Sequence, residues 1–370
     1  MNNPGPKAII HLDRLGQNIQ NIKKHLGGLP LACVVKANAY GHGAVPIAKK
    51  LESFGIQFFA VFSFDEAIEL RKAGIQSEIL IFSKIIPERL NEAIQNNFIL
   101  NLSSVKDLHF LEHFSEKKGE SPRFHLKFDT GMTRLGLDIQ EAEFVFLAIK
   151  NNPKLKCEGI YSHFATADEG DIAYAQQQLA LFNGLLDQAE TINLSFKYVH
   201  LSNSGSILNL PESRFNLVRV GMLAYGAAPS DEVSMDVSVK PVMNYCGTIV
   251  NVSHVPKGTS VSYGGVYKTK KASNIAVIQM GFADGFPRPW YVDGFVGYEG
   301  KEYKIAGRVC MDQFMVDFGE DMPEEGKDVL IFGLTEKNNI PVEKIAKAIN
   351  STTYVLLTAI GGRTEYNYKL

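Results

Sequence analysis

Short apolar runs alternate with segments of helical periodicity over the first two thirds of the chain. Strands are predicted at residues 31–36, 58–63, 78–82, 98–102, 124–129, 157–163, 197–202 and 216–221. Most are followed by segments, such as 65–74 and 171–192, whose apolar residues recur every three or four positions. Eight such units in about 200 residues predict a closed (β/α)8 barrel, the TIM-type fold. A doubly wound open sheet is the alternative, but no G-x-G-x-x-G motif follows the first strand.

The pattern changes near residues 227–242. Beyond this point, short strands separated by Gly and Pro turns are predicted at 247–255, 274–280, 301–309, 314–318 and 328–333, with one helix at 341–352. We therefore predict two domains, the barrel over residues 1–235 and a mostly β domain over residues 236–370. A strand and a helix at 7–26 precede the barrel, and the pattern leaves the pairing of that strand open.

Composition and charge exclude several classes of protein. The chain has 370 residues, more than one hydrophobic core usually organises. Its net charge of −2 gives no electrostatic reason to expect nucleic acid or a membrane surface as partner. We expect no membrane span, because no apolar run approaches the roughly eighteen residues that one needs. We expect no secretion signal, because the start "MNNPGPKAIIHLDR" has no basic segment followed by an apolar one.

The four cysteines point to a reducing compartment. Cys33, Cys157, Cys246 and Cys310 lie far apart and form no C-x-x-C pair. This spacing argues against a zinc site and against a disulfide framework. We therefore expect the protein in the cytoplasm, where thiols stay reduced.

Polar and charged residues collect where the predicted barrel strands end, which is where the active sites of such barrels lie. They are Lys36, Lys127, Asp129, Arg134, His163, Asn203, Ser204 and Arg219, and Gly221 closes the last strand beside Arg219. So many groups at five strand ends predict a lined pocket. The loops after the seventh and eighth strands, "SNSG" and "VGM", offer hydroxyl and backbone N–H donors to a phosphate. His200 lies within its strand, so we expect it to support the pocket from behind.

A lysine beside a phosphate site indicates capture of a carbonyl compound. Desolvation lowers the pKa of an amine and leaves it nucleophilic. From the residues alone, two classes fit. One is a sugar-phosphate aldolase whose lysine takes the substrate, and the other is a pyridoxal-phosphate enzyme whose lysine holds the cofactor aldehyde.

The segment "VVKANAYGHG" (34–43) resembles the pyridoxal-phosphate attachment site of bacterial alanine racemases. The resemblance continues, in the family's order, through "KFDTGMTRLG" (127–136), "IYSHFATAD" (160–168), "SNSG" (202–205), "VRVGMLAYG" (218–226), "VSYGG" (261–265), "GFADGFPR" (281–288) and "AGRVCMDQFMVD" (306–317). Eight motifs over nearly the whole chain are far more specific than any one of them. They imply a (β/α)8 barrel followed by a β domain, with pyridoxal 5'-phosphate as cofactor.

The resemblance also implies a role for each matching residue. Lys36 would hold the cofactor covalently and act as one of two bases, and Tyr263 would be the second base on the opposite face of the substrate α-carbon. The implied cofactor contacts are Tyr40, Asn203, Ser204, Gly221 and Met222 around the phosphate, Arg219 at the pyridine nitrogen with His163 behind it, and Arg134 near the phenolic oxygen. Lys127, which carries a carbamate in some members, would support Arg134. Arg134, Met311 and Asp312 would bind the substrate carboxylate.

The implied activity is the interconversion of L-alanine and D-alanine, which supplies D-alanine for peptidoglycan. The implied assembly is a homodimer in which Tyr263 and Met311 enter the partner's site. Two positions depart from the family pattern. Phe282 stands where many members have Tyr, and Gly362 stands where some place a tyrosine near the cofactor phosphate. A racemase of broader specificity, which also accepts serine, therefore stays open.

Two other functions on this fold fit the sequence less well. Non-catalytic pyridoxal-phosphate carriers resemble the barrel but lack the β domain, so the residues after 236 argue against that function. Decarboxylases on this fold typically place an acid at the ring nitrogen, where this chain has Arg219.

Overall fold

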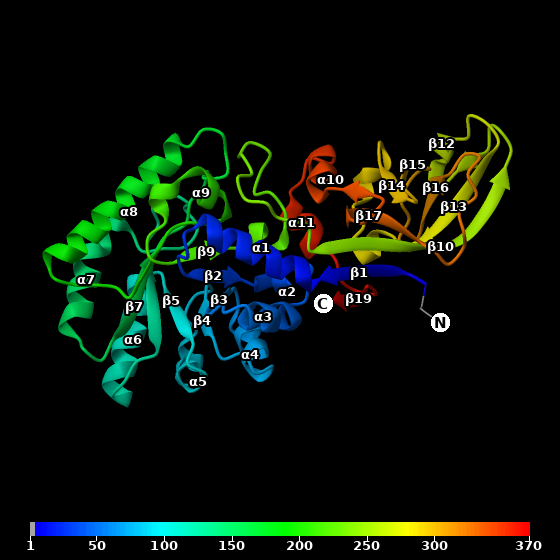
Figure 1. Cartoon of the computed structure of the whole chain (residues 1–370). Helices are drawn as coiled ribbons and strands as arrows, with labels where there is room; N and C mark the ends of the chain where they lie inside the picture. Colours follow the sequence, from blue (N-terminus) through cyan, green and yellow to red (C-terminus); the bar gives the residue numbers. More distant parts are fainter. Residues whose placement is uncertain (1–3) are drawn as a thin grey trace.

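Eight parallel strands surround the core of the first domain in this computed structural model, which describes residues 4–370 (Figure 1). The strands are β2 (Leu31–Val34), β3 (Phe58–Val61), β4 (Glu78–Ile81), β5 (Ile99–Leu102), β6 (Arg123–Lys127), β7 (Lys156–Tyr161), β8 (Tyr198–His200) and β9 (Val218–Val220). They pair in the order β8-β7-β6-β5-β4-β3-β2-β9. The Arg219 N–H donates to Ser202 O at 3.2 Å and links β9 back to the end of β8. The predicted (β/α)8 barrel and its eight strands are confirmed.

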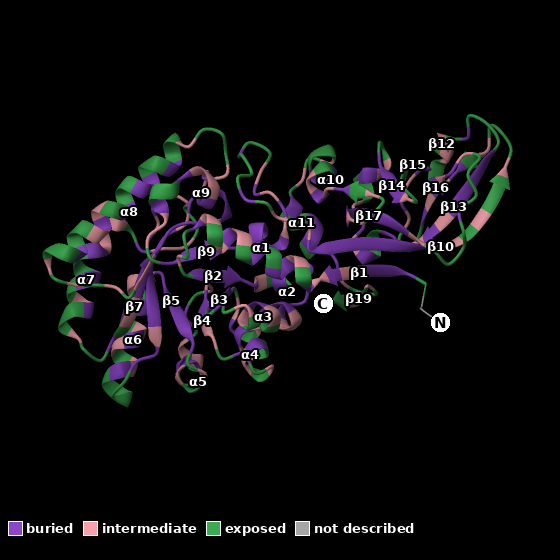
Figure 2. Cartoon of the chain, in the orientation of Figure 1, coloured by how far each residue is buried: buried purple, intermediate pink, exposed green. Residues whose placement is uncertain are grey.

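The barrel strands are buried on both faces because helices cover the outside of the ring. These helices are α3 (Ala44–Ser53), α4 (Phe64–Lys72), α5 (Leu90–Gln95), α6 (Val105–Lys118), α7 (Ala142–Asn151), α8 (Ala173–Thr191) and α9 (Ser204–Asn209). The segment labelled α2 (Lys36–Gly41) is instead a short turn with left-handed φ values that follows β2. Every residue of β2, β3 and β5 is buried, as expected for parallel strands between a core and a layer of helices. The helices turn one apolar face inward, for example Leu179, Phe182 and Leu185 of α8 (Figure 2).

The second domain is a closed antiparallel β barrel. Its strands are β10 (Met243–Val255), β13 (Ser273–Gln279), β14 (Phe295–Tyr298), β15 (Lys301–Ile305), β16 (Phe314–Asp317) and β17 (Asp328–Leu334). The sheet order β17-β14-β15-β16-β13-β10 closes on itself through a β10–β17 pairing. The short strand β18 (Asn339–Ile340) pairs with β17, and β11 (Ser260–Val261) and β12 (Tyr267–Lys268) form a separate two-stranded sheet. The five strands predicted for this part are confirmed, whereas β14, the short strands β11, β12 and β18, and the last strand at Glu365–Lys369 were missed.

Both ends of the described chain join the second sheet. Strand β1 (Pro6–His11) pairs antiparallel with β10 and parallel with β19 (Glu365–Lys369), which settles the pairing that the sequence left open. Helix α1 (Leu12–His25) then crosses to the barrel, where the Asn18 side-chain amide donates to Ala224 O at 3.1 Å. Residues 6–25 therefore tie the two domains together.

The remaining helices are short. They comprise α10 (Val342–Ala348), α11 (Thr353–Thr358) and 3-10 turns at Pro87–Arg89, Ile139–Glu141, Pro211–Ser213, Met222–Tyr225, Tyr263–Gly265, Phe282–Asp284 and Arg288–Tyr291. Helix α11 packs so tightly on α2 that a Cβ added to Gly41 would lie 2.0 Å from Leu357 O. Among residues 4–370, no helix has the length and apolar character that a membrane crossing requires.

Candidate active site

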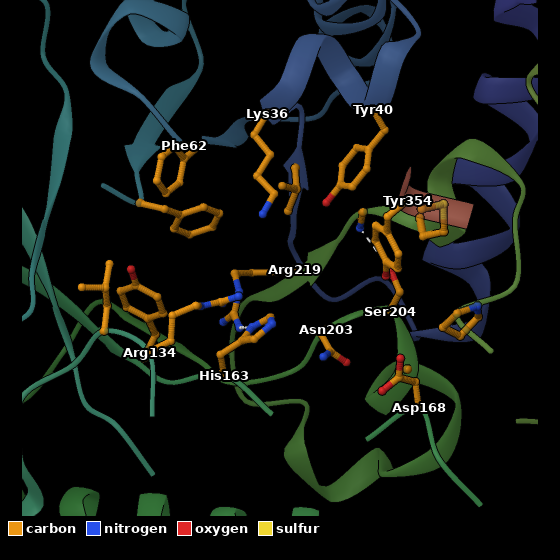
Figure 3. Close-up of a pocket in the computed structure, with 18 of the residues that line it drawn as sticks. Lys36, Tyr40, Phe62, Arg134, His163, Asp168, Asn203, Ser204, Arg219 and Tyr354 are labelled. Atoms are coloured by element: carbon orange, nitrogen blue, oxygen red, sulfur yellow. Dashed lines mark hydrogen bonds between the residues drawn. The ribbon is translucent and has the colours of Figure 1, made fainter. Parts of the chain in front are cut away.

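A cavity of 490 Å³ lies at the carboxyl ends of the barrel strands (Figure 3). Ten of the residues singled out in the sequence line it: Lys36, Tyr40, Lys127, Arg134, His163, Asn203, Ser204, Arg219, Gly221 and Met222. They come from α2, β6, β9 and the segments after β6, β7, β8 and β9. Strand ends that are up to 186 positions apart in the sequence, from Lys36 to Met222, therefore build one pocket.

Lys36 enters this cavity from an unusual turn. The four residues after it, Ala37, Asn38, Ala39 and Tyr40, have φ of 52°, 54°, 53° and 53°. This left-handed helical conformation costs an L-residue roughly 1–2 kcal/mol. The turn brings the Tyr40 side chain back to the same cavity as Lys36.

Hydrogen bonds hold the left-handed turn at both ends. At its start, the Ala37 N–H donates to Glu66 Oε1 at 2.7 Å. At its end, the Ala44 N–H donates to Asn38 Oδ1 at 2.8 Å. The buried His42 ring places Nδ1 3.0 Å from Ala39 O and 2.9 Å from a second carbonyl oxygen of the turn, so this nitrogen carries the hydrogen and donates. Burial lowers the pKa of His42 to about 4, so the ring stays neutral.

Hydroxyl groups and close-packed backbone form one end of the cavity. Ser204 Oγ accepts the N–H of Gly221 at 3.1 Å and that of Leu223 at 3.4 Å, which leaves its own hydrogen free to donate. A Cβ on Gly221 would lie 2.8 Å from the Tyr40 hydroxyl oxygen, so only glycine lets these two groups approach each other. Asn203 lies beside them, where its side chain accepts the Ser206 N–H at 3.0 Å. This end can donate several hydrogen bonds to one anion.

Arg219 lies at the centre of the cavity floor and is almost fully buried. Its Nη1 donates to His200 O and to His200 Nδ1, both at 3.0 Å. Its Nη2 donates to Ser162 O at 2.8 Å and Leu201 O at 3.0 Å, and lies 3.2 Å from His163 Nδ1. Both terminal nitrogens are therefore saturated, and only the Nε–H remains for a group in the cavity.

A pair of neutral histidines supports Arg219 from behind. Because Arg219 donates to His200 Nδ1, the His200 hydrogen is on Nε2, which lies 2.9 Å from His125 Nδ1. Burial lowers the pKa of His125 to about 3, and burial together with Arg219 lowers that of His200 well below its usual value. The guanidinium is thus oriented entirely by neutral groups, and His200 supports the cavity as its place in the strand predicted.

The cavity carries more positive than negative charge. Among the residues that the structure describes, no carboxylate lies within ion-pair distance of Lys36, Lys127, Arg134 or Arg219. Asp129 instead accepts the backbone N–H groups of the loop that bears Arg134, including that of Arg134 itself at 3.2 Å.

The pKa values of the two cavity lysines are lowered by burial and by this positive charge. Burial, with Arg134 and Arg219 nearby, lowers the pKa of Lys127 to about 8. Burial and Arg134 also lower the pKa of Lys36, which makes its neutral, nucleophilic form more accessible.

Several cavity residues were not predicted from the sequence. Phe62 and Phe82 form an apolar wall, and each directly follows a barrel strand, so the strand-end rule could have found them. Tyr354 comes from α11, and no local signal marks it. Its ring centroid lies 5.9 Å from that of Tyr40. Gly362 had suggested that the C-terminal segment lacks a tyrosine in this region, but Tyr354 provides one.

Three predicted site residues are not in the cavity of their own chain. Tyr263 and Met311 lie in the second domain and are 70% and 56% exposed. Asp312 follows Met311, and its carboxylate pairs with the Arg363 guanidinium at 2.8 Å. Phe282 lies on the same surface, because its N–H donates to the carbonyl oxygen of Cys310, the residue before Met311. A single chain therefore presents these groups to solvent and not to Lys36.

Known proteins resemble this chain over nearly its whole length. Two family profiles match it, "Alanine racemase, N-terminal domain" over residues 10–229 and "Alanine racemase, C-terminal domain" over residues 242–368. Alanine racemase 1 of Bacillus subtilis is 38% identical over 360 residues, which cover 96% of this chain and 91% of the relative.

Solved structures give the same result. The alanine racemase of Clostridium difficile superposes with a TM-score of 0.92 at 33% identity, over 100% of this chain and 96% of that one. The alanine racemase of Bartonella henselae, with covalently bound pyridoxal phosphate, superposes with a TM-score of 0.90 at 27% identity, over 99% and 100%.

Proposed function

The chain belongs to the alanine racemase family, and from this premise we propose that it interconverts L-alanine and D-alanine with pyridoxal phosphate as its cofactor. One observation carries the proposal. A partly buried lysine, a saturated arginine and a cradle of hydroxyl and backbone donors share one cavity at the carboxyl end of the barrel.

The cavity suits a phosphorylated aldehyde. Ser204, Tyr40 and the glycine at 221 would hold the phosphate, because a side chain at 221 would fill the space between them. The positive charges of Arg134 and Arg219, which no carboxylate within residues 4–370 neutralises by an ion pair, match a group that carries negative charge. Lys36, whose pKa burial lowers, is the amine that would form the covalent link.

The protein's own residues then perform the proton transfers. When bound, pyridoxal phosphate supplies an aldehyde that links to amines and a conjugated ring that draws electrons away from the substrate α-carbon. Lys36 takes or returns the α-proton on one face of that carbon, and a lowered pKa fits this role because the amine must be neutral to accept a proton. Arg219 would face the ring nitrogen of a bound cofactor with its free Nε–H and would offer it no acidic proton, since a guanidinium does not titrate at neutral pH.

The second base would come from another copy of the chain. The cavity's own phenols are poor candidates, because burial raises the pKa of Tyr40 and Tyr161 and raises that of Tyr354 to about 12. Tyr263 is exposed on the second domain and is free to reach another molecule. We therefore propose a homodimer in which residues 1–235, apart from β1, hold the cofactor and residues 236–370 contribute Tyr263 and Met311 to the partner's site.

Lys127 is proposed to carry a carbamate. Carbamates form when CO2 adds to a neutral amine with release of a proton, and a pKa of about 8 makes that form accessible near neutral pH. The product would place a negative charge next to Arg134, in a cavity that otherwise collects positive charge. We also place the enzyme in the cytoplasm, where D-alanine for cell-wall precursors would be made.

The function is tested by spectroscopy and by chirality. The purified protein should absorb in the visible range through its bound cofactor and should produce D-alanine from L-alanine, with L-serine assayed in parallel for the broader specificity. Lys36→Ala should abolish the absorption band and reduce turnover by about 10³-fold or more. A colourless protein with no racemase activity would contradict the proposal.

Mixing two inactive variants tests the shared site. In a mixed dimer, the Lys36→Ala copy would lend its Tyr263 to the intact Lys36 of a Tyr263→Phe copy, so one site is complete. Activity should therefore reappear when the two variants are dissociated and reassociated together. Activity that never exceeds the sum of the separate variants would show that both bases come from one chain.

A further inference from the structure

Glu66 does not line the cavity, yet it touches the turn that presents Lys36. One carboxylate oxygen, Oε2, accepts the N–H groups of Phe62 at 2.8 Å and Ser63 at 2.9 Å at the end of β3. The other oxygen, Oε1, accepts the Ala37 N–H at 2.7 Å. A single carboxylate therefore joins two neighbouring barrel loops, and one of them carries the proposed base.

Half of this arrangement is ordinary helix capping. Glu66 is the third residue of α4 and forms a capping box with Ser63, whose hydroxyl accepts the Glu66 N–H at 3.2 Å. Helix α6 offers a comparison. There Asp107 accepts the N–H and hydroxyl of Ser103 at 3.1 and 3.2 Å, with contacts only to its own loop. Capping thus needs one oxygen, and the second oxygen of Glu66 has a separate partner.

That partner is the first residue of the left-handed turn. Ala37 has a φ of 52°, a conformation that an alanine adopts only when its surroundings hold it there. Its N–H belongs to the peptide that joins it to Lys36, so the bond to Glu66 fixes the orientation of the Lys36 carbonyl and side chain. Without an acceptor here, the strained peptide could relax, and the amine would lose its direction into the cavity.

We propose that Glu66 is a positioning residue for Lys36, which it orients by fixing the Ala37 peptide at the start of the left-handed turn. The proposal rests on the proposed function only in taking Lys36 as a base. Its charge has a second consequence. Burial and Arg134 lower the pKa of Lys36 and Glu66 raises it, while Lys127 is a further positive neighbour, so loss of the carboxylate charge leaves the amine less basic.

The test compares Glu66→Gln with Asp107→Asn, a matched change in the capping acid of another barrel helix. Hydrogen exchange of the purified holoenzyme should be at least tenfold faster over residues 35–43 in Glu66→Gln and within twofold of wild type there in Asp107→Asn. The acid limb of the kcat profile for L-alanine, which reports groups of the substrate-bound enzyme in which the Lys36 amine is free, should move to lower pH in Glu66→Gln alone, a shift that mere loosening of the fold does not produce.

The two measurements separate the positioning role from the function. Unchanged exchange over residues 35–43 in Glu66→Gln, or an acid limb that stays at its wild-type pH, would overturn the role of Glu66. If wild-type protein shows no alanine turnover, the proposed function fails, and the exchange comparison still decides whether Glu66 holds the turn. Glu66→Asp keeps the charge but shortens the side chain, so it should accelerate exchange while the acid limb stays near its wild-type pH.

Discussion

The two ends of strand β6 place a cation in opposite surroundings. At its amino end, the Arg123 guanidinium binds Glu78 at 2.6 and 2.8 Å and Glu158 at 2.8 and 2.6 Å. At its carboxyl end, Lys127 lies in the cavity and forms no ion pair with any residue in the described range 4–370. The cation at the amino end of the barrel is thus neutralised by carboxylates of the same chain. The cation at the carboxyl end is neutralised only when an anion binds.

The acidic side chains near the cavity explain how its positive charge persists. Asp168 lines the cavity but forms no ion pair with its cations in residues 4–370. Glu66 and Asp129 lie on the loops around it and direct their oxygens to backbone N–H groups. They order the loops that carry Lys36 and Arg134 without neutralising either side chain. Carboxylates therefore stabilise the amino end by pairing with a cation, whereas at the carboxyl end they bind backbone N–H groups and leave the cations free for a ligand.

Replacing Arg219 by a carboxylate should have the largest effect. Arg219→Glu would offer an acidic proton to the ring nitrogen, which makes the ring a stronger electron acceptor and favours side reactions such as transamination. Racemisation should fall by roughly 10²-fold or more, while the share of turnovers that ends in transamination rises. Product analysis by chiral chromatography measures both. If the share of transaminated product stays at the wild-type value, Arg219 does not control the ring in this way.

Removing the paired cation should act on stability alone. Arg123→Ala leaves Glu78 and Glu158 facing each other without a partner, so the free energy of unfolding should drop by about 2–4 kcal/mol. Urea denaturation measures this loss, and Arg123→Lys, which keeps the charge but not the two-pronged geometry, should lose less. The kcat per folded molecule should not change. A large fall in kcat would contradict the claim that the amino end of the barrel serves stability and the carboxyl end serves catalysis.

Lys127, which has no ion-pair partner in residues 4–370, should have a smaller effect on stability, and that effect should depend on pH. The pKa of Lys127 falls from 10.5 to about 8 on folding, so the unfolded chain binds an extra proton between these pH values. Stability of the cofactor-free protein should therefore rise as pH increases from about 8 to about 10.5. Lys127→Met removes this contribution, and the rise should shrink by about 2 kcal/mol.

Lys127→Met is also the control for the carbamate. A carbamate signal in the NMR spectrum of protein equilibrated with isotopically labelled bicarbonate should strengthen as pH rises through about 8, and it should vanish in the variant. An equal rise in stability with pH in both proteins would mean that Lys127 is not the titrating group.

Much of this contrast could be predicted from the sequence. Each barrel strand is a short apolar run, and the residues that end these runs, such as Lys36 and Arg219, must meet at one rim once the strands close into a ring. The same rule applied to Phe62 and Phe82 would have given the apolar wall. Strand-end residues were predictable because their position follows from topology alone.

Other parts depend on contacts between distant segments. Tyr354 reaches the cavity because α11 packs on α2, and β1 joins the second sheet through β10 and β19. Neither packing leaves a periodic trace in the local sequence. The left-handed turn after Lys36 was also missed, because three of its four residues are not glycine or asparagine.

The central claim is that the charged end of the barrel holds an anionic aldehyde cofactor on Lys36. Borohydride reduction fixes a link between a cofactor and its lysine, so digestion and mass spectrometry of the reduced protein identify the residue directly. The account predicts the pyridoxyl phosphate mass on the peptide that contains Lys36 and on no other. The same mass on a different lysine, or no modified peptide at all in active enzyme, would contradict it.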